Sequence, residues 1–347
     1  MVAQRSLFPG LCPWGSCSTL AWPFWSGCFS PRLLPLVLRH LPQTARSLVV
    51  TETLASLQTE HHDPRYATIE LWPTATILDA LAEAQMAATA LVRAAVPALE
   101  TAVEAALPRL RAGGRLFYVG AGTAGRVGMQ DGVELTPTYG WPAERLVMLL
   151  AGGNGAASTA VEGAEDDEGA ARAEMAAHEV GPEDVVFGIA ASGNTPYTCA
   201  AAKAGREAGA LTIGISCVSG ARLLREAELG IVLPTGSEAV AGSTRLKAGT
   251  AQKAALNLLS TTLMIRLGHV YQGLMVDMRV TNTKLARRAM GMVRSLAGGS
   301  DEEIGAALKQ SDGNVKRAVL LRHGMSLAEA ERALEAAQGD LHAVLKS

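Results

Sequence analysis

Five short apolar runs alternate with helix-compatible segments in the middle of the chain, and this alternation constrains the fold more than any other feature. The runs lie at 115–119, 146–150, 184–190, 211–216 and 230–233, and Gly or polar residues bound each of them. Strands that alternate with helices form a parallel sheet covered on both faces. The sequence therefore predicts an α/β protein with a parallel five-stranded sheet flanked by helices.

Helical patterns flank the predicted sheet on both sides in sequence. Apolar residues at helical spacing from Ala75 to Leu110 predict helices interrupted at Pro97 and Pro108, and Ser243–Leu267 predicts one long helix. The tail predicts two or three short helices, with Ser300 and Ser326 as N-caps. The expected organisation is an N-terminal helical segment at 49–112, a sheet domain at 113–298 and a small C-terminal helical domain at 299–347.

Residues 1–48 differ in composition from the rest of the chain. They hold three of the five Cys, three of the five Trp and six Pro. The prolines interrupt the apolar run that a signal peptide or a membrane helix requires. We interpret this segment as a non-native or disordered extension, with the natural start near Val49 or Val50. A targeting arm that uses Arg32, Arg39 and Arg46 is the alternative.

Charge and cysteine spacing exclude several classes of partner. Thirty-one Lys and Arg against 33 Asp and Glu give a formal net charge of -2. This balance provides no basic field to gather nucleic acid or anionic lipid, so we expect neither nucleic acid nor a membrane as partner. The cysteines form no CxxC pair and accompany no His cluster, so we expect no metal site.

Three Gly-, Ser- and Thr-rich loops follow predicted strands. Backbone amides at helix starts bind anions, and hydroxyl side chains suit a phosphate monoester. The second strand ends in Leu-Leu-Ala-Gly-Gly, without the acidic residue that binds a nicotinamide ribose, so a sugar phosphate is expected rather than a dinucleotide. The candidate phosphate and substrate ligands are Gly122 and Thr123 in GAGTAG, Ser192, Asn194 and Thr195 in ASGNTP, and Ser243 and Thr244 in GSTRLKAGT.

Each loop taken singly is equally well explained as a Gly turn followed by a helix cap. Three such loops at successive strand ends favour a binding site, because the carboxyl ends of parallel strands meet at one edge of an open α/β sheet.

Longer strings carry a family resemblance, among them GAGTAGRVG, VELTPTYG, AVEGAEDD, GIAASGNTPY, GSTRLKAGTAQK and LMVDMRVTNTKL. They resemble the N-acetylmuramic acid 6-phosphate etherases, which carry a sugar isomerase (SIS) domain, colinearly from about Thr59 to the C-terminus. The resemblance implies an SIS-type sheet and a cytoplasmic homodimer without metal or redox cofactor. It also implies cleavage of the D-lactyl ether of the phosphorylated sugar, with N-acetylglucosamine 6-phosphate and D-lactate as products.

The chain departs from the family pattern at three motifs. The family's GTSGR appears with Ala124, ECPPT appears as Glu134-Leu135-Thr136-Pro137-Thr138, and ASGRTP appears with Asn194. These changes touch the substrate side of the loops and leave the acidic residues in place. They bear on the precise substrate more than on the class of reaction.

Cleavage of an ether at C3 of an open-chain sugar aldehyde requires two carboxyl roles. A base removes the acidic C2 proton, and an acid protonates the leaving lactate oxygen before activating the water that adds at C3. By resemblance, Glu134 takes the acid/base position and Glu165 is the C2 base. Read without the family, Glu134 is a loop carboxylate or cap, and Glu165 belongs to a solvated acidic face within EGAEDDEG. Which member of 162–168 faces the site is left open.

Two further functions share the phosphate-binding loops. One is a non-catalytic sugar-phosphate sensor, because SIS domains also serve in regulators. The other is an aldose-ketose isomerase, which deprotonates C2 but releases no lactate. Retention of Glu134 and Glu165 favours the lyase.

Overall fold

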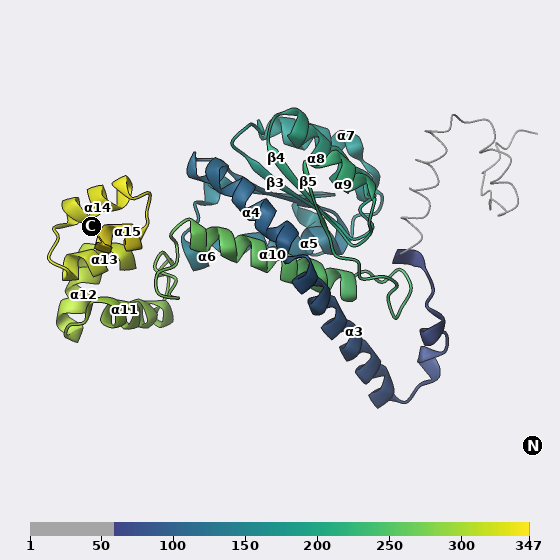
Figure 1. The fold of residues 1–347 in the computed structure, drawn as a ribbon, viewed down its shortest axis with the longest axis horizontal. Helices are drawn as coiled ribbons and strands as arrows, with labels where there is room; N and C mark the ends of the chain where they lie inside the picture. The colour runs from purple at the N-terminus through teal and green to yellow at the C-terminus, as the bar shows by residue number, and fades with distance from the viewer. Residues whose placement is uncertain (1–58, 347) are drawn as a thin grey trace, which may run out of the picture. The chain divides into compact units, whose positions relative to one another are not determined.

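The computed structural model describes residues 59–346 (Figure 1). The interpretation of residues 1–48 as an extension lies outside the described residues and stays a prediction.

A parallel five-stranded sheet forms the centre of the structure, as the apolar runs predict (Figure 1). The strand order is β2-β1-β3-β4-β5, and all four pairings are parallel. Every residue of β1, β3 and β4 is buried, which explains why these strands are mainly apolar; the buried polar residues of β4 are Thr212 and Ser216. The strands are β1 Leu116–Gly120, β2 Leu146–Leu150, β3 Val185–Ala190, β4 Leu211–Ser216 and β5 Leu229–Val232.

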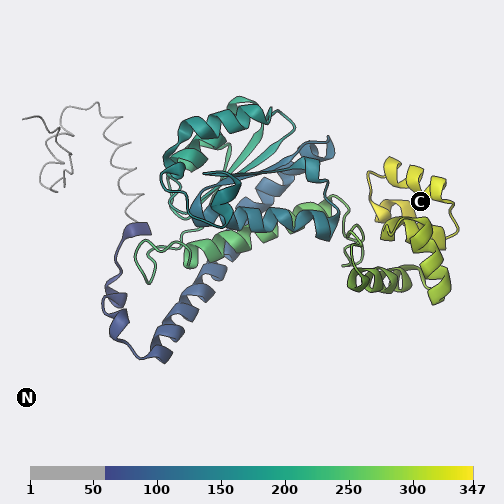
Figure 2. The same ribbon diagram turned by 180° about the vertical axis from the view of Figure 1, so that it is seen from behind.

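Two layers of helices cover the two faces of the sheet (Figures 1 and 2). Alternation along β1 divides its side chains between them: Leu116 and Tyr118 join one core, whereas Phe117 and Val119 join the other. The first layer contains α3 Thr74–Ala94, α4 Val96–Arg111, α5 Gly122–Val133 and α10 Lys247–Arg266, and the second contains α7 Glu168–Ala177 and α8 Pro196–Glu207.

The two prolines in the N-terminal helices behave differently. Pro97 lies in the first turn of α4, so the predicted break between α3 and α4 is confirmed. The interruption predicted at Pro108 is wrong, because Pro108 lies inside α4. The helix continues for only three residues beyond it, and the burial of Leu107 and Leu110 holds that last turn against the sheet.

Helix α3 packs along α10 and leaves much of its surface exposed. Its buried residues are Ala84, Ala88 and Val92, whereas Leu78 and Met86 are 61% and 65% exposed. Within residues 59–346 it is the one helix long and apolar enough to cross a membrane, by length and composition only.

The C-terminal helices have a hydrophobic core of their own. Ser300 and Ser326 each form a capping box, with Glu303 and Glu329, so both predicted caps are confirmed. Four helices lie beyond residue 299, one more than the upper prediction, and the same core includes α11. These elements are α11 Thr283–Ala297, α12 Asp301–Gln310, α13 Val315–Arg322, α14 Leu327–Ala336 and α15 Leu341–Lys346.

Candidate active site

A cleft of about 390 Å³ opens at the carboxyl ends of β1 and β3. These strands are neighbours, and their connections leave toward opposite edges of the sheet, which is the usual position for a ligand in an open α/β fold. Most residues predicted from the three loops line this cleft, namely Gly122, Thr123, Ser192, Asn194, Thr195 and Thr244. The convergence that the sequence predicted is therefore present.

The first loop presents the uncapped start of α5 to the cleft. Ala121 is the N-cap residue, and its side chain makes no capping hydrogen bond. The first amides of α5 therefore have no helical acceptor, and the positive end of the helix dipole faces the same space. Arg126 is not among the residues that line the cleft, and its Nε donates to the carbonyl oxygen of Ala156 at 3.0 Å.

The second loop is held in place by its own polar groups. The Ser192 hydroxyl oxygen accepts from the Asn194 amide at 3.2 Å, and Asn194 Oδ1 accepts from the Arg222 amide at 2.9 Å. Gly193 has φ +65°, and a Cβ there would lie 2.3 Å from Ser216 Oγ. Among residues 59–346, no acceptor is found for the Ser192 hydroxyl proton or the Asn194 amino group, so both can donate to a ligand.

The third loop differs from its prediction. Ser243 and Thr244 do not open the long helix, because α10 begins at Lys247. The first amides of α10, at Lys247 and Ala248, donate to the buried carboxylate of Glu238 at 3.0 and 2.9 Å. A carboxylate within the chain thus occupies this helix start. Thr244 lines the cleft, whereas Ser243 is not among its lining residues.

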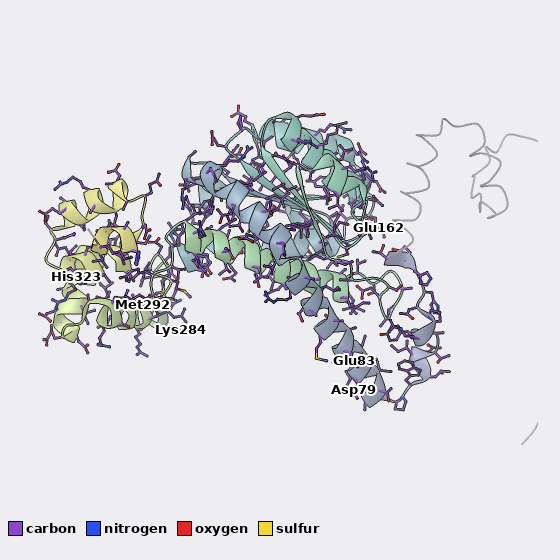
Figure 3. All side chains as sticks on the ribbon, viewed as in Figure 1. Asp79, Glu83, Glu162, Lys284, Met292 and His323 are labelled. Atoms are coloured by element: carbon purple, nitrogen blue, oxygen red, sulfur yellow. The ribbon has the colours of Figure 1, made fainter. Side chains whose placement is uncertain are left out.

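The structure separates the members of the acidic cluster 162–168. Asp167 caps α7 by accepting from the Ala170 amide at 2.8 Å. Glu168 accepts from Arg222 at 2.7 Å, and this hydrogen bond holds the pKa of Glu168 below its ordinary value. Glu162 is exposed and lies outside the cleft (Figure 3).

Glu165 and Asp166 are the members of the cluster that line the cleft. They lie in the short 3-10 turn Ala164–Asp166. Neither side chain has a hydrogen bond or ion pair with another residue of the described chain. The Glu165 carboxylate is therefore available to take a proton from a bound ligand.

Within one chain, Glu134 does not join Glu165 in the lining of the cleft. It is exposed at the junction of α5 and α6 (Leu135–Tyr139), outside the lining of the cleft. Since Gly122 begins α5 at the cleft, the length of this 12-residue helix, about 18 Å, separates Glu134 from the phosphate-binding end. The catalytic role of Glu134 stays a prediction.

Three polar residues of the cleft, Thr59, Glu60 and Gln252, were missed by sequence reasoning. Glu60 reaches the cleft because the Thr59 carbonyl accepts from the Gly242 amide at 3.2 Å. Gly242 has φ +74°, and a Cβ there would lie 2.7 Å from Glu60 Oε2. Gln252 lines the cleft from α10. Residues 59–64 form a TExxxP element at the start of the family resemblance, and this element was a signal for Glu60. A single glutamine within a helix gives no such signal.

A larger cavity of about 1020 Å³ lies elsewhere and contains none of the predicted site residues. Some of its basic residues already have partners within the chain: Lys316 pairs with Asp277, and Arg145 donates to the Gly114 carbonyl at 3.0 Å. The smaller cleft, which combines open helix amides with available carboxylates, is the better candidate.

Comparison with known proteins gives the family. Residues 98–206 match the glucokinase regulatory protein N-terminal SIS domain, and residues 162–262 match the SIS domain. The chain is 50% identical over 289 residues to the N-acetylmuramic acid 6-phosphate etherase of Deinococcus radiodurans, covering 83% of this chain and 95% of that protein. The chain belongs to the N-acetylmuramic acid 6-phosphate etherase family. Its resemblance to these etherases, first seen in the sequence strings, is confirmed.

A second etherase, from Salmonella typhimurium, is 42% identical over 294 residues and covers 84% of this chain and 99% of that protein. Among solved structures, a phosphoheptose isomerase from Francisella tularensis has a TM-score of 0.44 and 18% identity, covering 56% of this chain and 100% of that chain. The etherase identities extend beyond the SIS domain to nearly the whole of each relative.

Proposed function

We propose that this protein cleaves the D-lactyl ether of N-acetylmuramic acid 6-phosphate in the cytoplasm, giving N-acetylglucosamine 6-phosphate and D-lactate. The observation that carries the proposal is a cleft, in an etherase-family chain, that combines open helix amides and hydroxyls with the available carboxylate of Glu165. Amides and hydroxyls suit the phosphate, and the carboxylate suits removal of a proton. The reaction is redox-neutral, so the groups that it requires of the protein are a base and an acid.

The reaction is an elimination followed by hydration. Glu165 removes the C2 proton, the C2–C3 double bond forms, and the C3–O bond breaks as an acid protonates the lactate oxygen. Water then adds its oxygen at C3 and a proton returns to C2. In deuterated, ¹⁸O-labelled water, we expect the product sugar to carry deuterium at C2 and ¹⁸O at C3, as measured by mass spectrometry and NMR.

The isotope pattern separates this proposal from its competitors. Direct displacement at C3 would retain the original C2 hydrogen. An aldose-ketose isomerase would exchange C2 without releasing D-lactate, and a sensor would do neither. Lactate formed without deuterium at C2 would overturn the elimination mechanism.

Phosphate binding is proposed for the first two loops, with Gly122, Thr123, Ser192 and Thr195 as ligands. Removing a hydrogen bond to a charged group costs about 1.5 to 3 kcal/mol, or roughly 10- to 150-fold in affinity. Ser192→Ala should weaken N-acetylglucosamine 6-phosphate by that factor in calorimetry and leave any binding of N-acetylglucosamine unchanged. Ser158→Ala, an exposed serine outside the cleft, is the matched control. Equal losses for both sugars would indicate a folding defect instead.

We also propose that the protein is a homodimer in which Glu134 of one copy completes the cleft of the other. Helices α5 and α10 lie side by side, since Ser260 donates to Asp131 at 3.1 Å. Their layer exposes apolar side chains: Val133 is 47% exposed, Leu258 45% and Ile265 47%. A patch of this kind supports association with another protein surface.

Symmetry explains how a dimer would supply the missing carboxylate. A two-fold axis perpendicular to α5 that pairs this helix layer with itself would set the end of one α5 against the start of the other. Glu134 ends α5 and Gly122 begins it. The exposed part of α3, where Asp79 and Glu83 lie, extends the same layer and would enlarge the contact (Figure 3).

A further inference from the structure

Gln252 brings an unpartnered amide group to the wall of the cleft. Its side chain is on α10, lines the cleft and is only 1% exposed. Within the described residues, Nε2 has no hydrogen-bond partner. Nearly all buried polar groups in proteins are paired, because an unpaired donor has lost its hydration without replacement. An unpaired donor beside a ligand cleft therefore calls for a functional explanation.

The surroundings of Gln252 indicate which part of a ligand it would meet. It lies three residues after Gly249, on the same side of α10, and a Cβ on Gly249 would lie 3.4 Å from Thr123 Cγ2. Gln252 is thus next to the first phosphate-binding loop and one turn further along the helix. The amides that begin α10 are already bonded to Glu238, so they do not compete for this ligand.

The carboxamide group of Gln252 limits the roles that this residue can take toward a ligand. A glutamine amide is uncharged and does not titrate, so it is neither the acid nor the base of the reaction. It donates well to an uncharged oxygen, and Gln252 lies one helical turn beyond the loop to which the phosphate is assigned, where the rest of the sugar would lie. A carbonyl oxygen of an open-chain N-acetylamino sugar is an acceptor of this kind.

We propose that Gln252 is a positioning residue that donates a hydrogen bond from Nε2 to a carbonyl oxygen of the sugar, at C1 or in the N-acetyl group. The inference rests on the proposed function for the kind of sugar but concerns binding, not lactate release. In the free protein the donor stays unpaired, and the sugar satisfies it. Replacing it with an apolar group should therefore stabilise the fold and weaken the sugar complex at the same time.

The test replaces Gln252 with methionine, which has a similar length and no donor. We expect Gln252→Met to melt at the same or a higher temperature than the wild type. We expect N-acetylglucosamine 6-phosphate to bind about 5- to 150-fold more weakly and inorganic phosphate to bind equally well, both by calorimetry. Glucose 6-phosphate, which lacks the N-acetyl carbonyl, assigns the acceptor: a loss there supports the C1 carbonyl, and no loss supports the N-acetyl group.

Thr198→Val is the matched control. Thr198 is also fully buried with an unpartnered hydroxyl, but it lies outside the cleft. It should share the effect of Gln252→Met on melting and leave the affinity for N-acetylglucosamine 6-phosphate unchanged.

Three outcomes would overturn the assignment. They are unchanged affinity in Gln252→Met, a marked fall in its melting temperature, and equal losses for the sugar phosphate and inorganic phosphate. Because the readout is binding, failure of the wild type to release D-lactate would refute the proposed function without touching this result.

Discussion

Glu165→Gln is expected to lower D-lactate release from N-acetylmuramic acid 6-phosphate by about 100- to 10,000-fold, the usual contribution of a positioned general base. The substitution keeps the shape of the side chain and removes its capacity to accept a proton. Glu165 lines the cleft, and its carboxylate has no hydrogen bond or ion pair to another residue of the described chain, so the substitution breaks no contact there. Substrate affinity should therefore persist while turnover falls.

Glu162→Gln is the matched control, because Glu162 belongs to the same acidic segment but lies outside the cleft. It should retain wild-type turnover. Deuterium exchange at C2 of N-acetylglucosamine 6-phosphate in deuterated water gives a second readout, which should fall in parallel with lactate release in Glu165→Gln. Retained exchange in that variant would remove Glu165 from the role of C2 base and direct attention to Asp166, the neighbouring carboxylate of the cleft.

The sheet could be predicted from the sequence because each strand has a purely local signal. Strands buried on both faces are mainly apolar, as β1, β3 and β4 are, and the limits of β2 and β4 coincide with their predicted runs. The start of α10 could not be predicted in this way. It is fixed by the Glu238 carboxylate, nine residues before Lys247, and a contact of that kind leaves no periodic pattern.

The candidate site could likewise be predicted only in part. The three loops were predicted to converge because the carboxyl ends of parallel strands meet at one edge of the sheet, and the loops after the neighbouring strands β1 and β3 do so. The selection of Glu165 from its acidic neighbours needed the contacts that occupy Asp167 and Glu168. The amide of Gln252 is unpaired because of the way the side chains around it pack, and the spacing of residues in the sequence does not reveal this packing.

Glu134→Gln should also abolish most lactate release, by a factor of the same order, if its carboxylate protonates the leaving oxygen. In the proposed homodimer this carboxylate would serve the cleft of the second copy, because the length of α5 separates Glu134 from Gly122 in its own chain. A mixture of two inactive proteins tests this directly. Glu134→Gln chains and Glu165→Gln chains, unfolded together and refolded, should regain lactate release that neither protein has alone.

The expected recovery follows from counting sites. Random pairing makes half of the dimers mixed, and in each mixed dimer one cleft receives both substitutions and the other receives none. Activity should therefore return to about a quarter of the wild-type value at equal total protein. If both glutamates act within one chain, every cleft carries one substitution and mixing restores nothing. Refolding wild-type chains with the double variant gives the matched control, since that mixture should lose activity on forming mixed dimers only if the two carboxylates come from different copies.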